Sequence, residues 1–125
     1  MADITSAQNH KETRLTLKNR TDKAAVFNEV EVYSLPIKEA GFTGDAAVFA
    51  EGYQMLQQTA APLRELTPDT ASMDKDHYKL PQAAGCFTAY NFVYFEENGR
   101  VLLLGATSCV SYRTEIRISL ETVRL

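Results

Sequence analysis

Residues 86–108 read CFTAYNFVYFEENGRVLLLGATS, and this stretch decides the fold class. Its two apolar runs flank an Asn98-Gly99 pair, which accepts the positive φ angles of a tight two-residue turn. The aromatic and β-branched residues favour strand over helix. The sequence therefore predicts an antiparallel hairpin. Because VLLLG is apolar on both faces, we expect its second strand to be central and covered on both sides, which requires a second layer.

Further strands are expected on both sides of this hairpin, where apolar and polar residues alternate or β-branched residues gather. The expected strands are Thr13–Lys18, Ala25–Leu35, Ala46–Leu56 and Tyr112–Leu120. Gly52 should bend or bulge the third of these. About six strands without a convincing long amphipathic helix predict an all-β fold, an antiparallel β-sandwich.

The middle of the chain, residues 60–85, shows no sustained periodicity. It is expected to form one long irregular loop of about 25 residues, far longer than a usual connection, and such loops tend to be functional. A turn of helix near Ala61–Leu66 and partial disorder are both compatible with its composition.

Length and charge restrict the class of protein. The chain has 125 residues and a net charge of −3, which suits one domain. We expect a flexible polar leader at 1–12 and a single β-sandwich domain at 13–125. Basic residues are scattered among acids, which argues against nucleic acid, and no apolar run reaches the length of a membrane span. The polar start predicts a cytoplasmic protein, provided that Met1 is the natural start.

No catalytic motif is evident, and no cofactor is predicted. The sequence lacks GxSxG, GxGxxG, a phosphate loop and HExxH. Cys86 and Cys109 lack zinc-type spacing and are expected to be buried, reduced thiols, the alternative being one cross-strand disulfide. His10 and His77 each stand alone in polar sequence, which favours solvated side chains.

Two polar segments form the candidate site: EGYQMLQQTA at 51–60 and DKDHYKLP at 74–81. Sugar sites combine an aromatic ring with amide and carboxylate groups. The expected sugar-contacting residues are Tyr53, Gln54, Gln57, Asp74, Asp76, His77 and Tyr78. In the alternative interpretation, Tyr53 packs inward and the glutamines line an exposed edge. Asp74, Asp76 and His77 also form a weak DxDH metal pattern, which an acidic surface turn explains equally well.

Four segments carry a resemblance to a known family: EGYQMLQQT, DHYKLP, FTAYNFVYF and LLLGATSCVSYRTEIRI. Their order and spacing over residues 44–120 resemble the N-terminal β-sandwich of retaining α-galactosidases and raffinose-synthase-like glycoside hydrolases. The resemblance implies a galactose-mutarotase-like supersandwich placed before a catalytic (β/α)8 barrel whose two aspartates perform double displacement. This chain has no Trp, so Tyr53 would be the aromatic platform, and 125 residues cannot hold a barrel of about 250.

Three functions follow from these features. The first is a non-catalytic domain that binds a galactoside-type sugar weakly, alone or together with a missing barrel. The second is a structural or assembly module whose polar residues contact a partner domain. The third is a small mutarotase or isomerase that uses His77 and a carboxylate as acid and base. An incomplete sandwich would leave open sheet edges, so a homodimer or larger oligomer is expected.

Overall fold

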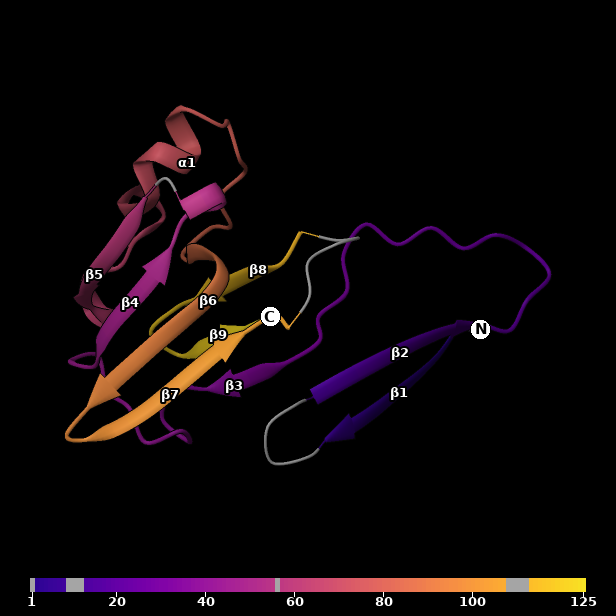
Figure 1. The fold of residues 1–125 in the computed structure, drawn as a ribbon, viewed down its shortest axis with the longest axis horizontal. Helices are drawn as coiled ribbons and strands as arrows, with labels where there is room; N and C mark the ends of the chain where they lie inside the picture. Colours follow the sequence, from indigo (N-terminus) through magenta and orange to yellow (C-terminus); the bar gives the residue numbers. More distant parts are fainter. Residues whose placement is uncertain (1, 9–12, 56, 108–112) are drawn as a thin grey trace. The chain divides into compact units, whose positions relative to one another are not determined.

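The computed structural model describes residues 2–8, 13–55, 57–107 and 113–125, and Figure 1 shows their elements. Strands dominate, and every strand pairing is antiparallel, which confirms the predicted all-β antiparallel class. The chain divides into two compact units, Met1–Tyr33 and Ser34–Leu125. This division falls after residue 33, whereas the sequence predicts a boundary after residue 12.

The first unit contains one hairpin. Strand β1 (Ala2–Gln8) pairs with β2 (Thr13–Asn19), with Ala2 opposite Asn19 and Gln8 opposite Thr13. The strand expected at 13–18 is confirmed. Residues 2–8, expected within a flexible leader, instead form a strand, because backbone pairing with β2 supplies the order that their own polar sequence does not indicate.

The strand predicted at Ala25–Leu35 is mostly wrong. Residues 24–33 form no strand, and only β3 (Ser34–Pro36) begins near its end. Val26 is 88% exposed and Phe27 is 52% exposed, so no layer covers the alternating apolar residues. Alternation alone does not make a strand, and among the described residues the stretch 24–33 pairs with no other strand.

The second unit is a seven-stranded sheet in the order β3-β9-β8-β6-β4-β5, with β7 also paired to β6. Its remaining strands are β4 (Ala47–Glu51), β5 (Gln58–Pro62), β6 (Phe87–Glu97), β7 (Arg100–Gly105), β8 (Glu115–Ile118) and β9 (Thr122–Arg124). Strands β4, β6, β7 and β8 lie within the predicted segments. Strands β5 and β9 were not predicted, since each is short and carries no clear alternation.

The longest strand, β6, organises this sheet. Strand β4 lies along one side of it, while the other side pairs first with β8, through Phe87–Tyr90, and then with β7, through Phe92–Glu97. Between these halves the register against β4 jumps, so that Ala50 faces Val93 but Glu51 faces Tyr90. Asn91, at φ 66°, lies in this bulge. Bulges bend a strand, so β6 contributes to two arms of one sheet.

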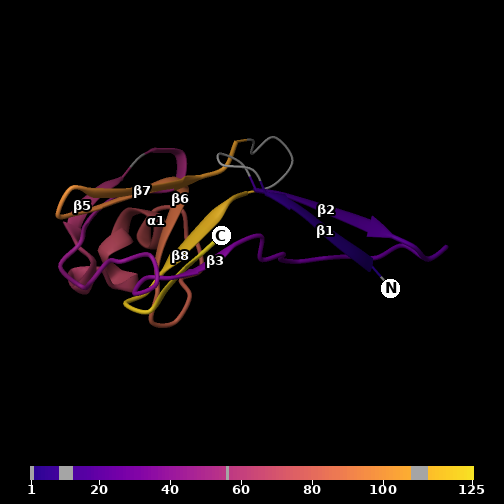
Figure 2. The same ribbon diagram turned by 90° about the horizontal axis from the view of Figure 1, so that it is seen from below.

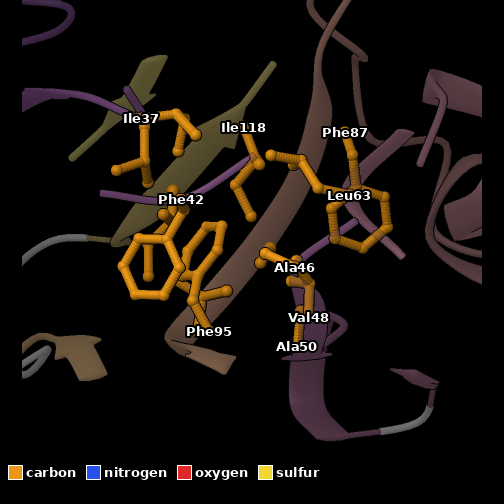
Figure 3. Close-up of a cluster of buried hydrophobic side chains, with 13 residues drawn as sticks. Ile37, Phe42, Ala46, Val48, Ala50, Leu63, Phe87, Phe95 and Ile118 are labelled. Carbon is orange, nitrogen blue, oxygen red and sulfur yellow. The ribbon is translucent and has the colours of Figure 1, made fainter. Parts of the chain in front are cut away.

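The two arms face each other across one core, which gives a sandwich-like arrangement (Figure 2). Figure 3 shows Val48 and Ala50 of β4, Phe95 of β6 and Ile118 of β8 around this core, to which Val123 of β9 also belongs. The rings of Phe42 and Phe95 lie 5.7 Å apart within it. The buried cluster comprises Ile37, Phe42, Ala46, Val48, Ala50, Leu63, Phe87, Ala89, Val93, Phe95, Ile116, Ile118 and Val123.

Strand β7 is not the central strand that the sequence predicts. Among the described residues it pairs with β6 alone, so it is an edge strand. Leu102 and Leu104 pack against the core, whereas Val101 is 55% exposed and Leu103 is 64% exposed. The predicted hairpin with β6 is confirmed, and both Asn98 and Gly99 have the positive φ angles that its turn requires.

The segment predicted as one long loop contains short helical turns after β5. These are η2 (Leu63–Glu65), η3 (Pro68–Ala71) and α1 (Ser72–Asp76). The helical turn expected near 61–66 is therefore confirmed. No helix in the described segments is long and apolar enough to cross a membrane. Cys86 is a free, buried thiol, while His10 and Cys109, the other half of the alternative disulfide, lie outside the described residues.

Replacing Phe95 by alanine tests the core. Phe95 is fully buried against Phe42, so its removal leaves a cavity, and we expect the free energy of unfolding to fall by about 3–5 kcal/mol. Urea denaturation followed by circular dichroism measures this change. Leu120→Ala is the control: Leu120 is 59% exposed, and its truncation should change the free energy by no more than about 0.5 kcal/mol. Equal losses in both variants would contradict this core.

Candidate functional site

The structure brings the two predicted segments together. After β4 the chain turns at η1 (Tyr53–Met55), where Gln54 takes a left-handed conformation, at φ 55° and ψ 28°. The Tyr53 ring meets the Tyr78 ring edge-on, with centroids 5.1 Å apart, and the His77 ring meets Tyr78 at 4.8 Å. The Tyr78 hydroxyl donates a hydrogen bond to Gln54 Oε1 at 3.3 Å. We call Tyr53, Gln54, His77 and Tyr78 the aromatic rim.

Asp74 holds the two segments together from beneath. Its side chain is fully buried, and its Oδ1 accepts a hydrogen bond from the Tyr53 backbone N–H at 2.9 Å. Its carbonyl accepts another from the Leu80 N–H at 3.1 Å. Asp74 was predicted to contact sugar, but a buried carboxylate cannot reach a ligand on the surface. It is a positioning residue for the rim instead.

The burial of Asp74 is incompletely compensated. Its Oδ2 has no hydrogen-bond partner among the described residues. Burial disfavours the charged form and raises the pKa of Asp74 above its usual 3.8, while the Tyr53 N–H partly opposes this shift. Keeping this buried carboxyl group charged therefore costs stability at neutral pH, although its hydrogen bond to the Tyr53 N–H is stabilising.

Gly52 permits this close approach. A Cβ placed on Gly52 would lie 2.9 and 3.1 Å from the two Asp74 carboxylate oxygens and 3.0 Å from the Gln57 carbonyl oxygen. The Gly52 N–H donates to that same carbonyl at 2.6 Å. The predicted bend or bulge at Gly52 is thus the point at which β4 ends, and only glycine leaves space for the carboxylate.

Gln57 also has a structural contact. It is partly buried, and its Nε2 donates a hydrogen bond to the Thr70 carbonyl at 2.6 Å, which ties β5 to η3. Of the predicted site residues, Gln54, Asp76 and His77 are exposed, and Tyr53 and Tyr78 are partly exposed. Gln57 is half-buried like the two tyrosines, so Asp74 is the one predicted site residue that a ligand on the surface cannot reach.

Sequence reasoning missed Tyr90, which links the rim to the sheet. The Tyr90 ring lies 5.5 Å from the Tyr53 ring, and the side chain is buried beside the bulge of β6. Its hydroxyl has no hydrogen-bond partner in the described part of the chain. Burial, reinforced by the Glu115 carboxylate, raises the pKa of Tyr90 to about 12. The aromatic run in β6 was the available signal, but it did not indicate which ring faces the rim.

The weak metal pattern is not realised as a site. Asp74 is buried against Tyr53 N–H, whereas Asp76 and His77 are exposed. Among the described residues, no group of three or more histidine, cysteine, aspartate or glutamate side chains is placed to hold a metal ion. Both carboxylates belong to the one-turn helix α1, and only Asp76 lies on the surface as the acidic surface-turn interpretation expects.

Comparisons with models of known protein families, with curated proteins and with solved structures find no match for this chain. The resemblance to α-galactosidase-type sandwiches therefore rests on the quoted motifs alone.

Two substitutions at Asp74 test its positioning role. Asp74→Ala leaves the Tyr53 N–H without its acceptor, so we expect the free energy of unfolding to fall by about 1–3 kcal/mol. Asp74→Asn keeps an oxygen acceptor and removes the buried charge, so it should lie closer to the native protein. Urea denaturation at neutral pH compares the three chains, and an equal loss in both variants would contradict this role.

The raised pKa of Asp74 also predicts a pH dependence. The folded protein binds this proton more tightly than the unfolded chain, so stability rises as the pH falls through the folded pKa towards 3.8. Asp74→Asn cannot take up the proton. The free-energy difference between native and Asp74→Asn chains should therefore shift in favour of the native chain on acidification. Parallel stability curves over that range would show that the pKa is not raised.

Gly52→Ala tests the contact between β4 and α1. The new methyl group must displace the Asp74 carboxylate or the Gln57 carbonyl, so we expect a loss of about 1–3 kcal/mol in urea denaturation. Gly44→Ala is the matched control, since its Cβ would make ordinary contacts at 3.4 and 3.6 Å. The double variant with Asp74→Ala removes part of the clash. Its loss of stability should therefore be smaller than the sum of the losses in the two single variants. Strict additivity would contradict the contact.

Proposed function

We propose that this chain is a non-catalytic, carbohydrate-associated β domain whose aromatic rim contacts a galactoside-type sugar weakly. The observation that carries the proposal is the hydrogen bond from Tyr78 to Gln54 beside the edge-packed rings of Tyr53 and His77. This combination places apolar ring surface next to an amide and a hydroxyl, which suits a sugar's C–H patch and its neighbouring hydroxyl groups.

The rim is held in place before any ligand arrives. Asp74 fixes the Tyr53 backbone and Gln57 fixes η3, so the exposed side chains lose little further freedom on binding. Asp76 adds an exposed carboxylate at the end of α1, which can accept hydrogen bonds from sugar hydroxyls. Few exposed groups contribute, so the expected affinity is low, with a Kd on the order of millimolar.

The resemblance to the N-terminal domain of α-galactosidase-type hydrolases suggests the context. In such an arrangement the rim would border a pocket whose catalytic groups belong to a barrel outside this chain, and the sugar would be shared between the two. A chain of 125 residues does not contain that barrel.

The second candidate function is a structural or assembly module. It is favoured by one observation: Asp74 and Gln57 direct their polar groups at the chain's own backbone. In this case the exposed rim residues would contact a partner domain and sugar would have no effect.

A small mutarotase or isomerase ranks last. Its acid and base require His77 beside a carboxylate, yet the ring contact of His77 is with Tyr78 at 4.8 Å, and no described carboxylate hydrogen-bonds to it. His77→Ala should leave the rate of anomer interconversion unchanged if this ranking is right.

Titration with galactose, melibiose and raffinose tests the sugar proposal. We expect the backbone amide resonances of Gln54, His77 and Tyr78 to shift at millimolar sugar, because these residues line the rim. Tyr78→Phe removes one hydroxyl and should weaken binding about two- to tenfold, the worth of one neutral hydrogen bond.

Tyr94→Phe is the matched control for this titration. Tyr94 lies in the half of β6 that pairs with β7, away from the half that contains Tyr90, so its hydroxyl should not affect the titration. Resonances that stay fixed at high millimolar concentrations of all three sugars would exclude the binding function and favour the assembly module.

A further inference from the structure

Strand β7 leaves one edge of the sheet open. Its inner side pairs with Phe92–Glu97 of β6, and no other strand of the described chain pairs with it. Val101 and Leu103 are among the most exposed large apolar side chains, at 55% and 64%. Natural edge strands usually carry charges, prolines or bulges that prevent pairing, and the run VLLLG at 101–105 has none of these.

The register shows which backbone groups are free. The two-residue turn at Asn98-Gly99 closes on Glu97 and Arg100, which form a hydrogen-bonded pair in such a hairpin. Hydrogen-bonded pairs then recur at every second residue, at Leu102 and Leu104. The bond from the Ala106 N–H to the Asn91 carbonyl, at 3.0 Å, continues this alternation.

It follows that three residues of β7 direct their backbone N–H and C=O groups away from β6. These are Val101, Leu103 and Gly105, whose positions alternate with the hydrogen-bonded pairs. The exposed apolar side chains of Val101 and Leu103 therefore stand on the same residues that offer free hydrogen-bonding groups.

We propose that β7 pairs antiparallel with β7 of a second copy of this chain, about a two-fold axis at Leu103. This pairing sets Leu103 opposite its own copy, Val101 opposite Gly105, and Leu102 opposite Leu104. None of these pairs contains a charged residue. The N–H and C=O groups of Val101, Leu103 and Gly105, which β6 does not use, would form hydrogen bonds between the two copies. The β5-β4-β6-β7 arm of each copy would become half of one continuous sheet.

The self-complementary edge is the reason to choose a second copy as the occupant. An isologous contact uses the same patch twice, so a strand that matches itself in side chains and backbone register needs no other partner. The face of the sheet that carries the Leu103 side chain supports this choice. In the strand register, Leu103 lies opposite Tyr94 of β6, which lies opposite Phe49 of β4. Beside them a shallow hollow of about 410 Å³ is lined by residues of β4, β5 and β6. Paired copies would thus align two such apolar rows.

This inference is independent of the proposed sugar contact. It uses β7 and the second half of β6, whereas the aromatic rim packs on Tyr90 in the first half. Either proposal can fail without the other, since the sugar titration measures binding at the rim and the molecular mass measures dimerisation through β7.

The test is sedimentation of the full chain over a range of concentrations, with light scattering as a second measure of mass. We expect twice the chain mass at high concentration. Leu103→Lys places a charge at the axis and should weaken dimerisation at least about tenfold, since it removes a buried leucine contact. Leu103→Pro removes an N–H that β6 does not use and should also give a monomer.

Leu120→Lys is the matched control, because Leu120 is 59% exposed in the same unit but lies outside β7. It should leave the dimer intact. A native chain that stays monomeric at all concentrations would overturn the proposal, as would a dimer that persists in both Leu103 variants.

Amide hydrogen exchange then tests the register. In the dimer the amides of Val101, Leu103 and Gly105 should be protected, and dilution should abolish their protection. The amides of Leu102 and Leu104 should be protected in both states, because they bond to β6. A protected Leu103 amide in a monomer would mean that another segment of the same chain covers the edge, and this result would also overturn the proposal.

Discussion

The bulge at Asn91 is the constraint on which the second unit depends. It places two extra residues between the pairs Ala50–Val93 and Glu51–Tyr90, and Asn91 takes a positive φ to allow this. Because the strand bends there, its first half can pair with β8 and its second half with β7 on the same side. Without the bend, one straight strand would carry a flat sheet whose apolar face had no opposing layer.

The aromatic rim is built on the same bend. Tyr90, the residue before Asn91, points its ring at Tyr53, and Tyr53 in turn supports Tyr78. Asp74 then fixes the Tyr53 backbone, and Gly52 leaves space for its carboxylate. Two of the buried polar groups that lack hydrogen-bond partners among the described residues, Asp74 Oδ2 and the Tyr90 hydroxyl, lie at this junction. Such uncompensated burial is costly, so it is expected where a surface site must be held in shape.

The sequence predicts what is local and misses what depends on distant pairing. The Asn98-Gly99 turn and the two runs around it were enough to place the β6–β7 hairpin, because two-residue turns fix their own register. Residues 25–33 alternate as well as any strand but pair with no other strand in the described part of the chain, and the run VLLLG predicts a central strand although β7 pairs there with β6 alone. Tyr53, Gln54, His77 and Tyr78 do come together above Asp74, yet composition cannot tell that Asp74 is buried while Asp76 is exposed.

The bulge also separates two surfaces that could otherwise interfere. The half of β6 before Asn91 supports the rim through Tyr90, and the half after it holds β7 with its open edge. A strand that added to β7 would extend the sheet along hydrogen bonds of the second half and would leave the Tyr53–Tyr90 contact unstrained, because a bulge interrupts the ladder between them. One long strand thus carries the aromatic rim at one end and the open edge at the other, and substitutions at Leu103 and at Tyr78 should act independently because they act on different halves of it.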